Sequence, residues 1–588
     1  MSMNMDKPRV YWRKNQVYLR FPTTVASSAT PDEVNEEVRK HLDDLNSNVL
    51  KDAQLQLAPL GQQGSSQGVA AQQATSGGKL LNGVYLFPLQ PSLLPSAGQP
   101  QSEIAGVFQI ESTATTGTMS GMSDMPDMPG MNPAETPDYT LTVVTHMNAA
   151  NLASRQASTP AIPNMFWSGA EDTTHGCPVA PPMPVEESAG QWHITLPGIP
   201  EALQNATGEG VTVFVLDTLP PAQQIQQAAQ NAGNNNVLLQ GLVENAVFTY
   251  DRLSDDEAAN PEQLVVTGKD ITGKLEGFPM PDHGLFIAGI VHDIAPAAKI
   301  ECVRVLSNYG VGELKTLAAA LSDIQNRMAP GGNLEGQPVV INLSLLVMPP
   351  ENETCVPEFT PEIKERVREE LAHLLGRLIG DKAVIVASAG NDSDPRDTMM
   401  NPNGVRYWAR YPAYFAYDTE FPLQGIIPVG AVNGQGQDAS YSNYPGPKGI
   451  ATYGGEIPTI VSQGGSSGTQ VAMPPDALRG VYTSPTYPTL SPSDPAPITT
   501  PQGFHEYPAP NSYAWAYWSG TSFATPIISA LAARTLENQQ ALTGRAVHDA
   551  ITAGAPQVEW THLEDKTTGS SPVIQAVQRA QVSQAQPA

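Results

Sequence analysis

The chain contains few of the features that mark nucleic-acid-binding or membrane-spanning proteins. Its 588 residues include only 31 lysines and arginines against 58 aspartates and glutamates, which gives a net charge of −27. Because proteins bind phosphate backbones through clustered lysine and arginine, this balance argues against nucleic acid as a partner. The sequence also contains no apolar run of the roughly 18 residues that a membrane-spanning helix needs, so we expect no membrane partner.

Cysteine is scarce as well. Cys177, Cys302 and Cys355 cannot form a disulfide framework, and the sequence contains no CxxC pair. Charges are scattered through the N-terminal segment, which therefore lacks the unbroken apolar core of a secretory signal. These features predict free thiols and favour a cytoplasmic protein, or a secreted one if a leader has been removed.

Proline and glycine, in contrast, are abundant. The chain has 54 prolines and 50 glycines, whereas average usage of the two together is about 12%. Hydrophobic residues make up 40% of the chain, enough for a sizeable core. The composition predicts a globular, loop-rich protein with two to four domains, or one large domain with an appendage.

Residues 1–188 differ from the rest of the chain in composition and in the pattern of their apolar residues. Val10–Phe21 and Leu81–Pro88 are typical of strands, and we expect a third strand at Asp138–Val144. Pro31–Leu50 has acidic residues in its first turn and the apolar spacing of a helix. Stretches rich in glutamine, serine, glycine and methionine separate these elements. The pattern predicts a smaller N-terminal α+β region with disordered inserts.

In residues 189–588, short apolar runs rich in β-branched residues alternate with helical patterns. Continuous apolar strands of this kind are typical of parallel sheets that are buried on both faces. The sequence therefore predicts an α/β fold with a parallel sheet and helices on both faces. The strands are expected at Val211–Leu216, Lys299–Leu306, Pro338–Leu345, Ala383–Ser388 and Ile426–Val432, with helices at Glu313–Met328 and Glu362–Ile379.

Polar or glycine-rich segments follow four of these five strands. Ligands of open parallel sheets bind at the carboxyl ends of the strands, so a site is expected there. Asp217 ends one apolar strand, and Asn391 follows another directly after a glycine. The exception is Pro338–Leu345, which carries Asn342 and Ser344 inside its apolar run.

Two further residues begin apolar helices. His283 precedes an apolar segment with two glycines, and Ser522 opens a strongly apolar helix with Pro526 in its first turn. The N-terminus of such a helix offers unpaired backbone N–H groups and a positive dipole end, which suit an oxyanion. Each candidate could instead have a structural role, as a helix cap, a turn residue or a satisfied buried group.

Together these segments resemble the subtilisin-like (subtilase) serine peptidases, in which the residues occur in the order Asp, His, Ser. The resemblance lies in VTVFVLDT around the aspartate, DHGLFIAGIV around the histidine and SGTSFATP around the serine. VVINLSL, ASAGN and ASYSNYP complete the series in the family's order. The match covers about residues 189–555 and leaves residues 1–188 uncovered.

The resemblance implies roles for the candidate residues. Ser522 would attack a peptide carbonyl, His283 would pass its proton to the leaving amine, and Asp217 would orient the imidazole. Asn391 and the Ser522 N–H would bind the oxyanion. Substrate would pair with two backbone edges beside a side-chain pocket. The residues implied for these edges and the pocket are Gly310, Val311, Gly312, Leu345, Leu346, Ser388, Ala389 and Gly390.

Several positions depart from the family's pattern. Leu285 and Phe286 stand where the family usually has threonine and a second histidine. Leu346 stands where a glycine usually leaves room for substrate. Inserts at about residues 219–281 and 455–518 are expected to be loops near the active face, where they could control access.

The sequence predicts neither a metal nor a cofactor. The acidic cluster Asp255–Glu257 lacks the ligand spacing of an EF-hand, and His175 with Cys177 supplies only two possible zinc ligands. The methionine-rich run Met119–Asn132 could hold copper through thioethers, but a linker is the simpler interpretation.

Three functions stay open from the sequence. An endopeptidase acting on protein or peptide substrates is favoured, because all four catalytic groups are present. A pseudoprotease would bind peptides in the same cleft without cutting them. In the third case, the motif matches are accidental and the protein is a non-catalytic binding protein. The oligomeric state is not predicted.

Residues 1–188 stand where secreted relatives carry a prodomain, which assists folding and inhibits the protease. The linker Cys177–Gly190 is rich in proline and looks exposed, so it is a candidate processing site. The alternative is that residues 1–188 remain as a permanent recognition or regulatory domain.

Overall fold

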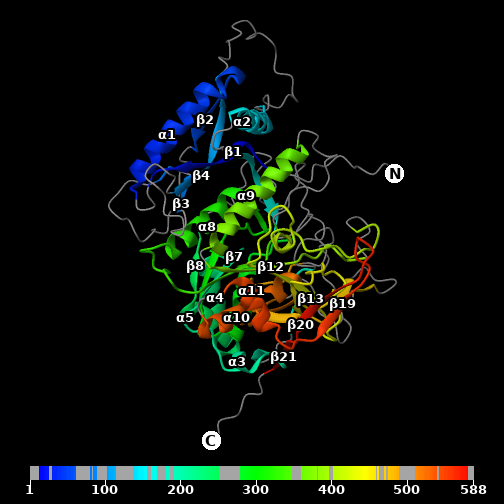
Figure 1. The fold of residues 1–588 in the computed structure, drawn as a ribbon. Coiled ribbons are helices and arrows are strands. Elements are labelled where there is room, and N and C mark those ends of the chain that lie inside the picture. The colour runs from blue at the N-terminus through cyan, green and yellow to red at the C-terminus, as the bar shows by residue number, and fades with distance from the viewer. Residues whose placement is uncertain are drawn as a thin grey trace, which may run out of the picture. The chain divides into compact units, whose positions relative to one another are not determined.

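The computed structural model divides into two units, Met1–Phe166 with Pro349–Glu370 and Trp167–Met348 with Leu371–Ala588 (Figure 1). Four features named above, Asp255–Glu257, His175 with Cys177, Cys355 and Met119–Asn132, lie outside the described residues. The structure describes residues 12–25, 29–60, 80–81, 84–88, 102–113, 137–154, 160–168, 180–185, 191–250, 278–346, 359–380, 382–395, 401–457, 460–462, 469–471, 475–488, 510–539 and 542–580.

The first unit is built on an antiparallel sheet with the strand order β5-β1-β4-β2, and β3 pairs with β4 beside β2. Helix α1 packs against β2, and α2 packs against β1. This order is the split β-α-β arrangement and confirms the expected N-terminal α+β region. The elements are β1 (Trp12–Thr23), α1 (Pro31–Asn48), the short 3-10 helix η1 (Lys51–Ala53), β2 (Leu55–Pro59), β3 (Val84–Pro88), β4 (Ser102–Ser112), α2 (Thr140–Ser154) and β5 (Ala161–Ser168).

A capping box explains where α1 begins. The Glu33 N–H donates to the Thr30 hydroxyl at 3.4 Å, and the Thr30 N–H donates to the Glu33 carboxylate at 2.8 Å. These bonds satisfy backbone donors that the first helical turn leaves unpaired. Val34, Val38 and Leu42 recur at four-residue spacing and are buried. The predicted helix is therefore confirmed.

The strand predicted at Asp138–Val144 is wrong, because helix α2 begins at Thr140. Asp138 lies just before the helix, and its carboxylate accepts from the Thr140 N–H at 2.9 Å and the Thr140 hydroxyl at 2.6 Å. Val143 and Met147 on this helix are buried. The β-branched residues favour a strand locally, but the capping interaction and the burial of one helical face outweigh that preference.

An ion pair joins Glu370 to the sheet of the first unit. Arg20 on β1 donates to the two carboxylate oxygens of Glu370 at 2.8 and 2.9 Å, and to Glu103 on β4 at 3.1 Å. Burial alone would lower the pKa of Arg20, but the hydrogen bonds and charge of Glu370 raise it above its ordinary value. Because Glu370 is fully buried, its charge needs this bidentate partner.

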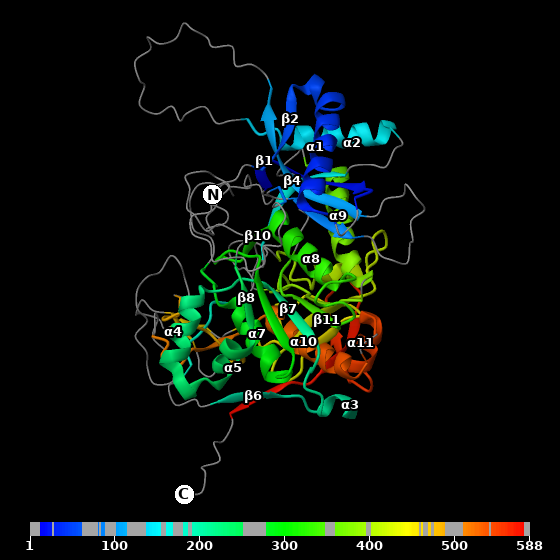
Figure 2. The same ribbon diagram turned by 90° about the vertical axis from the view of Figure 1, so that its left-hand side faces the viewer.

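The second unit is built on a nine-stranded sheet in the order β19-β20-β14-β13-β12-β11-β7-β9-β8. Figure 2 shows β11, β7 and β8 of this sheet. All neighbouring strands in it are parallel except β19 and β20. This confirms the predicted α/β fold with a mostly parallel sheet. The strands are β7 (Thr212–Asp217), β8 (Val247–Thr249), β9 (Lys299–Arg304), β11 (Val339–Leu343), β12 (Val384–Ser388), β13 (Ile426–Val432), β14 (Ile450–Tyr453), β19 (Gln557–Trp560) and β20 (Gly569–Ile574).

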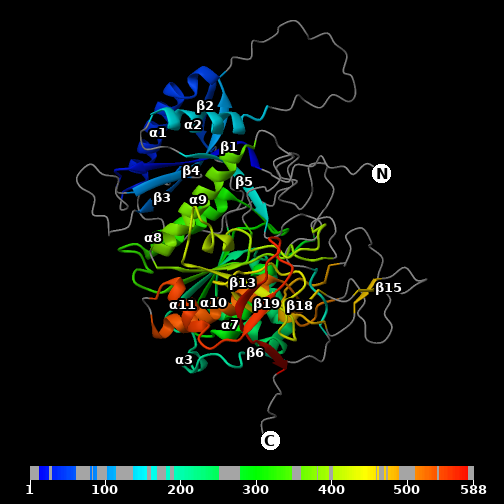
Figure 3. The same cartoon turned by 45° about the vertical axis from the view of Figure 1, so that its right-hand side comes forward.

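Helices cover both faces of this sheet. Helices α7, α10 and α11 lie on one face, and α8 lies on the other (Figures 1 and 3). Helices α7 and α10 are buried over most of their length, as expected for helices that are apolar all round. Outside the two inserts, the other elements are β6 (Trp192–Thr195), α3 (Glu201–Gln204), α7 (His283–Ile294), β10 (Val311–Glu313), α8 (Leu314–Met328), α9 (Pro361–Gly380), η3 (Ala413–Ala416), α10 (Thr521–Asn538), α11 (Gly544–Ile551) and β21 (Val577–Ala580).

The first insert, at about residues 219–281, is expected to be a loop, but part of it is helical. It contains α4 (Ala222–Ala232), the 3-10 helix η2 (Gly233–Asn235) and α5 (Val237–Asn245). Abundant glutamine and asparagine favour a loop. However, Ile225, Ala229 and Ala232 recur at helical spacing and are buried, so the apolar face decides the structure.

The second insert also contains regular structure. Strands β17 (Leu478–Val481) and β18 (Trp515–Trp518) form an antiparallel pair whose residues are buried. Strands β15 (Ile460–Ser462) and β16 (Thr469–Val471) form a second pair. The prediction of a loop is therefore wrong for these residues, and in the β17–β18 pair aromatic and aliphatic side chains enter the core.

The described part of the linker Cys177–Gly190 is largely buried rather than exposed. The backbone N–H and C=O of Met183 both pair with Tyr517 on β18, each at 2.9 Å. The Trp518 indole donates to the Ala180 carbonyl at 2.7 Å. Pro182 and Pro184 lack N–H groups, so Met183 between them is the residue that can make a full backbone pair here. The segment Ala180–Val185 therefore lies along β18 as an extra edge.

Two smaller expectations concern cysteine and membranes. Cys302 is a free thiol, as predicted, and burial raises its pKa. None of the helices in the described ranges is long and apolar enough to cross a membrane.

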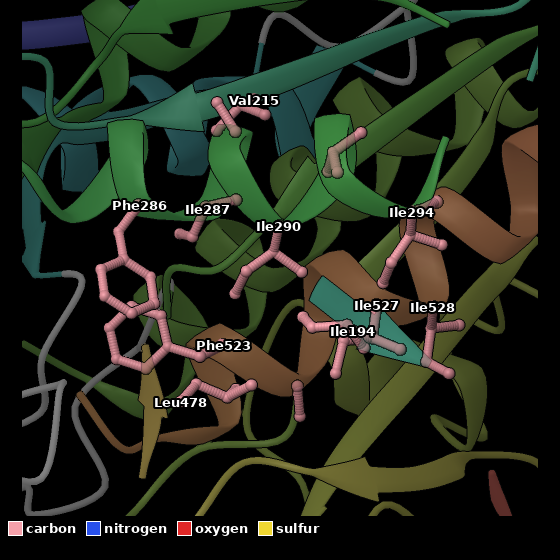
Figure 4. Close-up of a cluster of buried hydrophobic side chains, with 14 of the residues drawn as sticks. Ile194, Val215, Phe286, Ile287, Ile290, Ile294, Leu478, Phe523, Ile527 and Ile528 are labelled. Carbon is pink, nitrogen blue, oxygen red and sulfur yellow. The ribbon is translucent and has the colours of Figure 1, made fainter. Parts of the chain in front are cut away.

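Helices α7 and α10 pack directly on each other, and Phe286 lies at their contact (Figure 4). The ring centroid of Phe286 lies 4.6 Å from that of Phe523 and 5.7 Å from that of Trp518. The resemblance described above implies a histidine at position 286, and here Phe286 fills the core instead.

We predict that Phe286→Ala lowers the free energy of unfolding by about 3–5 kcal/mol, because it removes a buried ring and leaves a cavity. Urea denaturation measures this change. Val577→Ala serves as the control, since Val577 is 38% exposed and its truncation should change stability little. Equal losses in the two variants would contradict the packing described here.

Candidate active site

Asp217 and His283 form a buried hydrogen-bonded pair at the carboxyl end of β7. His283 Nδ1 lies 2.7 Å from Asp217 Oδ1, and the Thr218 N–H donates to the same oxygen at 2.6 Å. Each of the paired residues is only 1% exposed. A carboxylate at Nδ1 favours the proton on that nitrogen, so Nε2 is the nitrogen left to accept a proton. The structure thus brings together two residues that the sequence placed in one site.

Thr218 and Gly284 make this close approach possible. The Thr218 hydroxyl donates to the Met280 carbonyl at 3.0 Å and accepts from the Gly284 N–H at 3.2 Å. A side chain on Gly284 would place its Cβ 2.2 Å from the Thr218 carbonyl oxygen and 2.8 Å from the Asp217 Cβ. Only glycine therefore lets α7 start so close to the end of β7.

Ser522 lies in the first turn of α10, one residue after the helix begins. Its hydroxyl donates to the Ser344 carbonyl at 3.4 Å, and the Ser344 hydroxyl donates to the Ser522 carbonyl at 3.0 Å. Contrary to the prediction, Pro526 lies beyond the first turn, as the sixth helical residue. Because proline has no N–H, it leaves the Ser522 carbonyl without its helical donor, and Ser344 supplies one instead.

This bond explains the polar residues inside the apolar strand segment that the sequence singled out. Asn342 donates to the Ser529 hydroxyl at 3.0 Å, and Ser344 Oγ lies 3.0 Å from Asn342 Oδ1. All three side chains are fully buried. Asn342 and Ser344 therefore connect β11 and the residue after it to α10, and they fix the helical turn that carries Ser522.

Asn391 lies after the end of β12 and contacts the same turn. Its Oδ1 accepts from the Thr521 N–H at 3.0 Å and from the Thr521 hydroxyl at 2.9 Å. Two donors on one oxygen fix the orientation of the amide. Gly390, with φ of 106°, supplies the left-handed backbone that turns the chain from β12 toward this position.

The residues implied for substrate binding are buried, with their backbone partly paired. The Val311 carbonyl accepts from the Ser307 N–H at 2.7 Å, and Gly312 bridges to Leu306. The Ala389 N–H donates to the Val429 carbonyl at 2.9 Å. Their role in binding substrate stays a prediction. Gly310, Gly312, Leu345, Leu346, Ser388 and Gly390 are likewise buried.

The candidate side chains Asp217, His283 and Ser522 are buried in this structure. Among the described residues, neither His283 Nε2 nor Asp217 Oδ2 has a hydrogen-bond partner. The His283 ring lies edge-on to Trp518 and Phe523, with centroids 5.6 and 5.2 Å away. Ser522 is also fully buried.

Sequence reasoning missed three residues that support this arrangement. Thr218 directly follows Asp217, and Thr521 directly precedes Ser522. Their positions next to candidate residues were the sequence signal that could have identified them. Asp282, next to His283, has no assigned role in the motif around the histidine. In the ranges that the structure describes, no group of three or more His, Cys, Asp or Glu side chains could hold a metal ion.

We predict that Gly284→Ala lowers the free energy of unfolding by about 1–3 kcal/mol, because the new Cβ forces α7 away from β7. The same shift should lengthen the Asp217–His283 contact. Thermal unfolding measures the first effect. Gly289→Ala on the same helix is the control, since the nearest atom to its Cβ would belong to the Val481 side chain, at 3.2 Å. A Gly284→Ala protein as stable as the control would contradict the close approach.

Comparisons with known proteins identify the family. A lanthipeptide protease of known crystal structure is 18% identical, with 60% of this chain and 82% of that chain covered and a TM-score of 0.34. A cold-adapted subtilisin-like serine proteinase is 17% identical, with 62% and 89% covered and a TM-score of 0.31. No curated protein matches the chain. The Subtilase family profile matches residues 208–581, and the chain therefore belongs to the subtilase family of serine peptidases.

Proposed function

We propose that the protein is a serine endopeptidase in which Ser522, His283 and Asp217 form the catalytic triad. The observation that carries this proposal is the buried hydrogen bond of 2.7 Å between His283 Nδ1 and Asp217 Oδ1. It orients the imidazole and leaves Nε2 as the proton acceptor. Membership of the subtilase family supports protein or peptide substrates.

In the proposed reaction, Ser522 Oγ attacks the carbonyl carbon of the scissile peptide bond while His283 Nε2 takes the hydroxyl proton. The imidazolium, stabilised by Asp217, then donates that proton to the leaving amine. Water hydrolyses the acyl-enzyme by the same proton route. Ser522 Oγ now donates to the Ser344 carbonyl, so the first step requires its hydroxyl to turn toward His283.

Asn391 and the start of α10 suit the developing oxyanion. Both donors to Asn391 Oδ1 come from Thr521, so the amide is held beside the helix N-terminus that carries Ser522. The side-chain amide and the Ser522 N–H would donate to the oxyanion together. The positive end of the helix dipole adds to this stabilisation.

The buried state of Ser522 and His283 supports regulated activity. An enzyme that is closed until covering residues move would not cleave proteins indiscriminately. We include in the proposal that the N-terminal region restrains activity and is processed by the enzyme itself. A pseudoprotease remains the second candidate, because the same buried state would suit a protein that no longer cuts peptides.

A serine-directed fluorophosphonate probe tests the activity. We expect the wild-type protein, once it has been incubated so that it can process itself, to be labelled on Ser522, and Ser522→Ala to lose labelling entirely. Asp217→Asn should lower kcat by about 10⁴-fold, because the imidazole loses its orienting carboxylate. Ser570→Ala is a control, since Ser570 is an exposed serine on β20 and takes no part in the candidate site. Labelling that persists in Ser522→Ala would contradict the assignment, and an unlabelled wild-type chain would favour the pseudoprotease.

Incubation of the purified full chain tests self-processing. We expect N-terminal sequencing to find the new terminus outside Ala180–Val185, because this segment is paired with β18 and cannot enter an active site as an extended strand. Ser522→Ala should stay intact. A fully active chain that remains uncut would end the processing proposal, and a cut inside Ala180–Val185 would contradict the pairing.

A further inference from the structure

Asp282 stands directly before His283 and occupies the N-cap position of α7. At this position an aspartate ordinarily accepts from an N–H in the first turn of its own helix. The Asp282 carboxylate makes no such bond. It is fully buried and accepts from the N–H and hydroxyl of Thr483, at 2.7 and 2.5 Å, and from those of Ser484, at 3.1 and 2.6 Å.

The chain of hydrogen bonds continues to Gln224. Its Nε2 donates to the Thr483 hydroxyl at 3.0 Å and to the Ser484 hydroxyl at 3.3 Å. Each hydroxyl thus accepts from Gln224 and donates to Asp282, which fixes the direction of both protons. Gln224 lies on α4 in the first insert, and Thr483 and Ser484 lie in the second insert. The two inserts therefore meet at the residue that precedes His283.

The backbone of Asp282 transmits this anchoring to the candidate histidine. The Asp282 carbonyl accepts the first helical hydrogen bond of α7, from the Phe286 N–H at 2.8 Å. A displacement of Asp282 would therefore displace the helical turn that carries His283.

The other end of the network reaches the turn of the candidate serine. Thr483 and Ser484 follow β17, which pairs with β18 from Leu478–Trp518 to Val481–Trp515. Strand β18 ends only a few residues before Ser522. The network therefore connects the starts of α7 and α10 through one hairpin.

The burial of the Asp282 carboxylate constrains the geometry of this hydrogen-bond network. Burial raises the pKa of Asp282, and the hydrogen bonds from Ser484 and Thr483 act against that rise. Burying a charged carboxylate away from water costs free energy unless hydrogen-bond donors of the protein replace the water. Charge-assisted hydrogen bonds are also shorter and stronger than neutral ones. The carboxylate therefore holds its donors, and hence both inserts, in one geometry.

We propose that Asp282 is a positioning residue for His283, and that the two inserts act on catalysis through it. This inference rests on the proposed peptidase function and deepens it. The inserts do more than cover the active face: Gln224 supports Thr483 and Ser484, and these hold Asp282. Catalysis then depends on Gln224 of α4 through these contacts, rather than through substrate.

Four variants of the full chain test the inference. Asp282→Asn weakens the network at its centre, because an amide has one acceptor oxygen where the carboxylate has two. Gln224→Ala removes the outermost donor, from a half-buried position on α4. Its control is Gln240→Ala in the same insert, whose amide donates to the carbonyls of Ala229 and Gly233 instead. The control for Asp282→Asn is Asp418→Asn, another buried carboxylate that accepts backbone N–H groups.

The first readout is kinetic, with fluorophosphonate labelling of Ser522 and peptide hydrolysis. We expect Asp282→Asn to lower the labelling rate and kcat by about 10–100-fold with KM unchanged, since small displacements of catalytic groups cost this much. Gln224→Ala should lower both by about 3–10-fold. The double variant should be no slower than Asp282→Asn alone, because both act through one network. The inference would be overturned if the two effects multiplied in the double variant, or if the controls lost as much labelling rate and kcat as the test variants.

The second readout does not depend on activity. Hydrogen exchange should speed up in peptides covering residues 280–287 and 482–487 in both Gln224→Ala and Asp282→Asn, and in neither control. If wild-type protein is not labelled, the proposed function fails, while the exchange data still decide whether the two inserts meet at Asp282. Unchanged exchange near His283 in Gln224→Ala would overturn the connection even in an active enzyme. If Asp282→Asn does not fold, Ser484→Ala replaces it with the same expectations.

Discussion

The candidate site depends first on the close packing of α7 and α10 against each other and against the parallel sheet. Both helices are almost entirely buried, so each loses much of its stabilisation if it moves away from the other. His283 begins one helix and Ser522 lies in the first turn of the other. The contact of Phe286 with Phe523 therefore fixes the relative position of the two helices that carry these residues. Tight packing of this kind leaves few alternative arrangements.

Polar groups at the carboxyl edge of the sheet then set the orientation of these side chains. Asp217 binds His283, and Ser344 and Asn391 contact the turn that carries Ser522 or its neighbour. Each of these groups follows or ends a parallel strand. Because parallel strands present their carboxyl ends along one edge, residues far apart in the chain arrive together without a long shared loop.

The inserts have a different relation to the site from the one their composition suggests. Helices α4 and α5 and the β17–β18 hairpin belong to the hydrophobic core, through residues such as Ile225 and Trp518. The segment Ala180–Val185 lies on the same hairpin. An element so well anchored is suited to hold neighbouring groups in place, which is the role that the contacts of Asp282 indicate for it.

Much of the fold could be predicted from the sequence, because in most elements the local preferences of the chain agree with the structure that packing favours. Periodicity and helix-start signals identify the continuous apolar strands and the helix at Pro31–Leu50. The strand expected at Asp138–Val144 is wrong, since β-branched residues favour strands while the Asp138 cap and one buried face favour a helix. The loop expected in the Gln/Asn-rich insert is wrong for a similar reason, because burial of three apolar residues outweighs its polar composition.

The order of the candidate residues and the types of elements that carry them can be read from local pattern and motif. Which groups meet depends instead on the packed fold: Asp217 meets His283, Ser344 meets the Ser522 carbonyl that Pro526 leaves without a donor, and Asp282 meets Thr483 and Ser484. The physical reason is that hydrogen bonds between distant segments depend on distances that helix and sheet packing sets. No local preference in the chain encodes those distances.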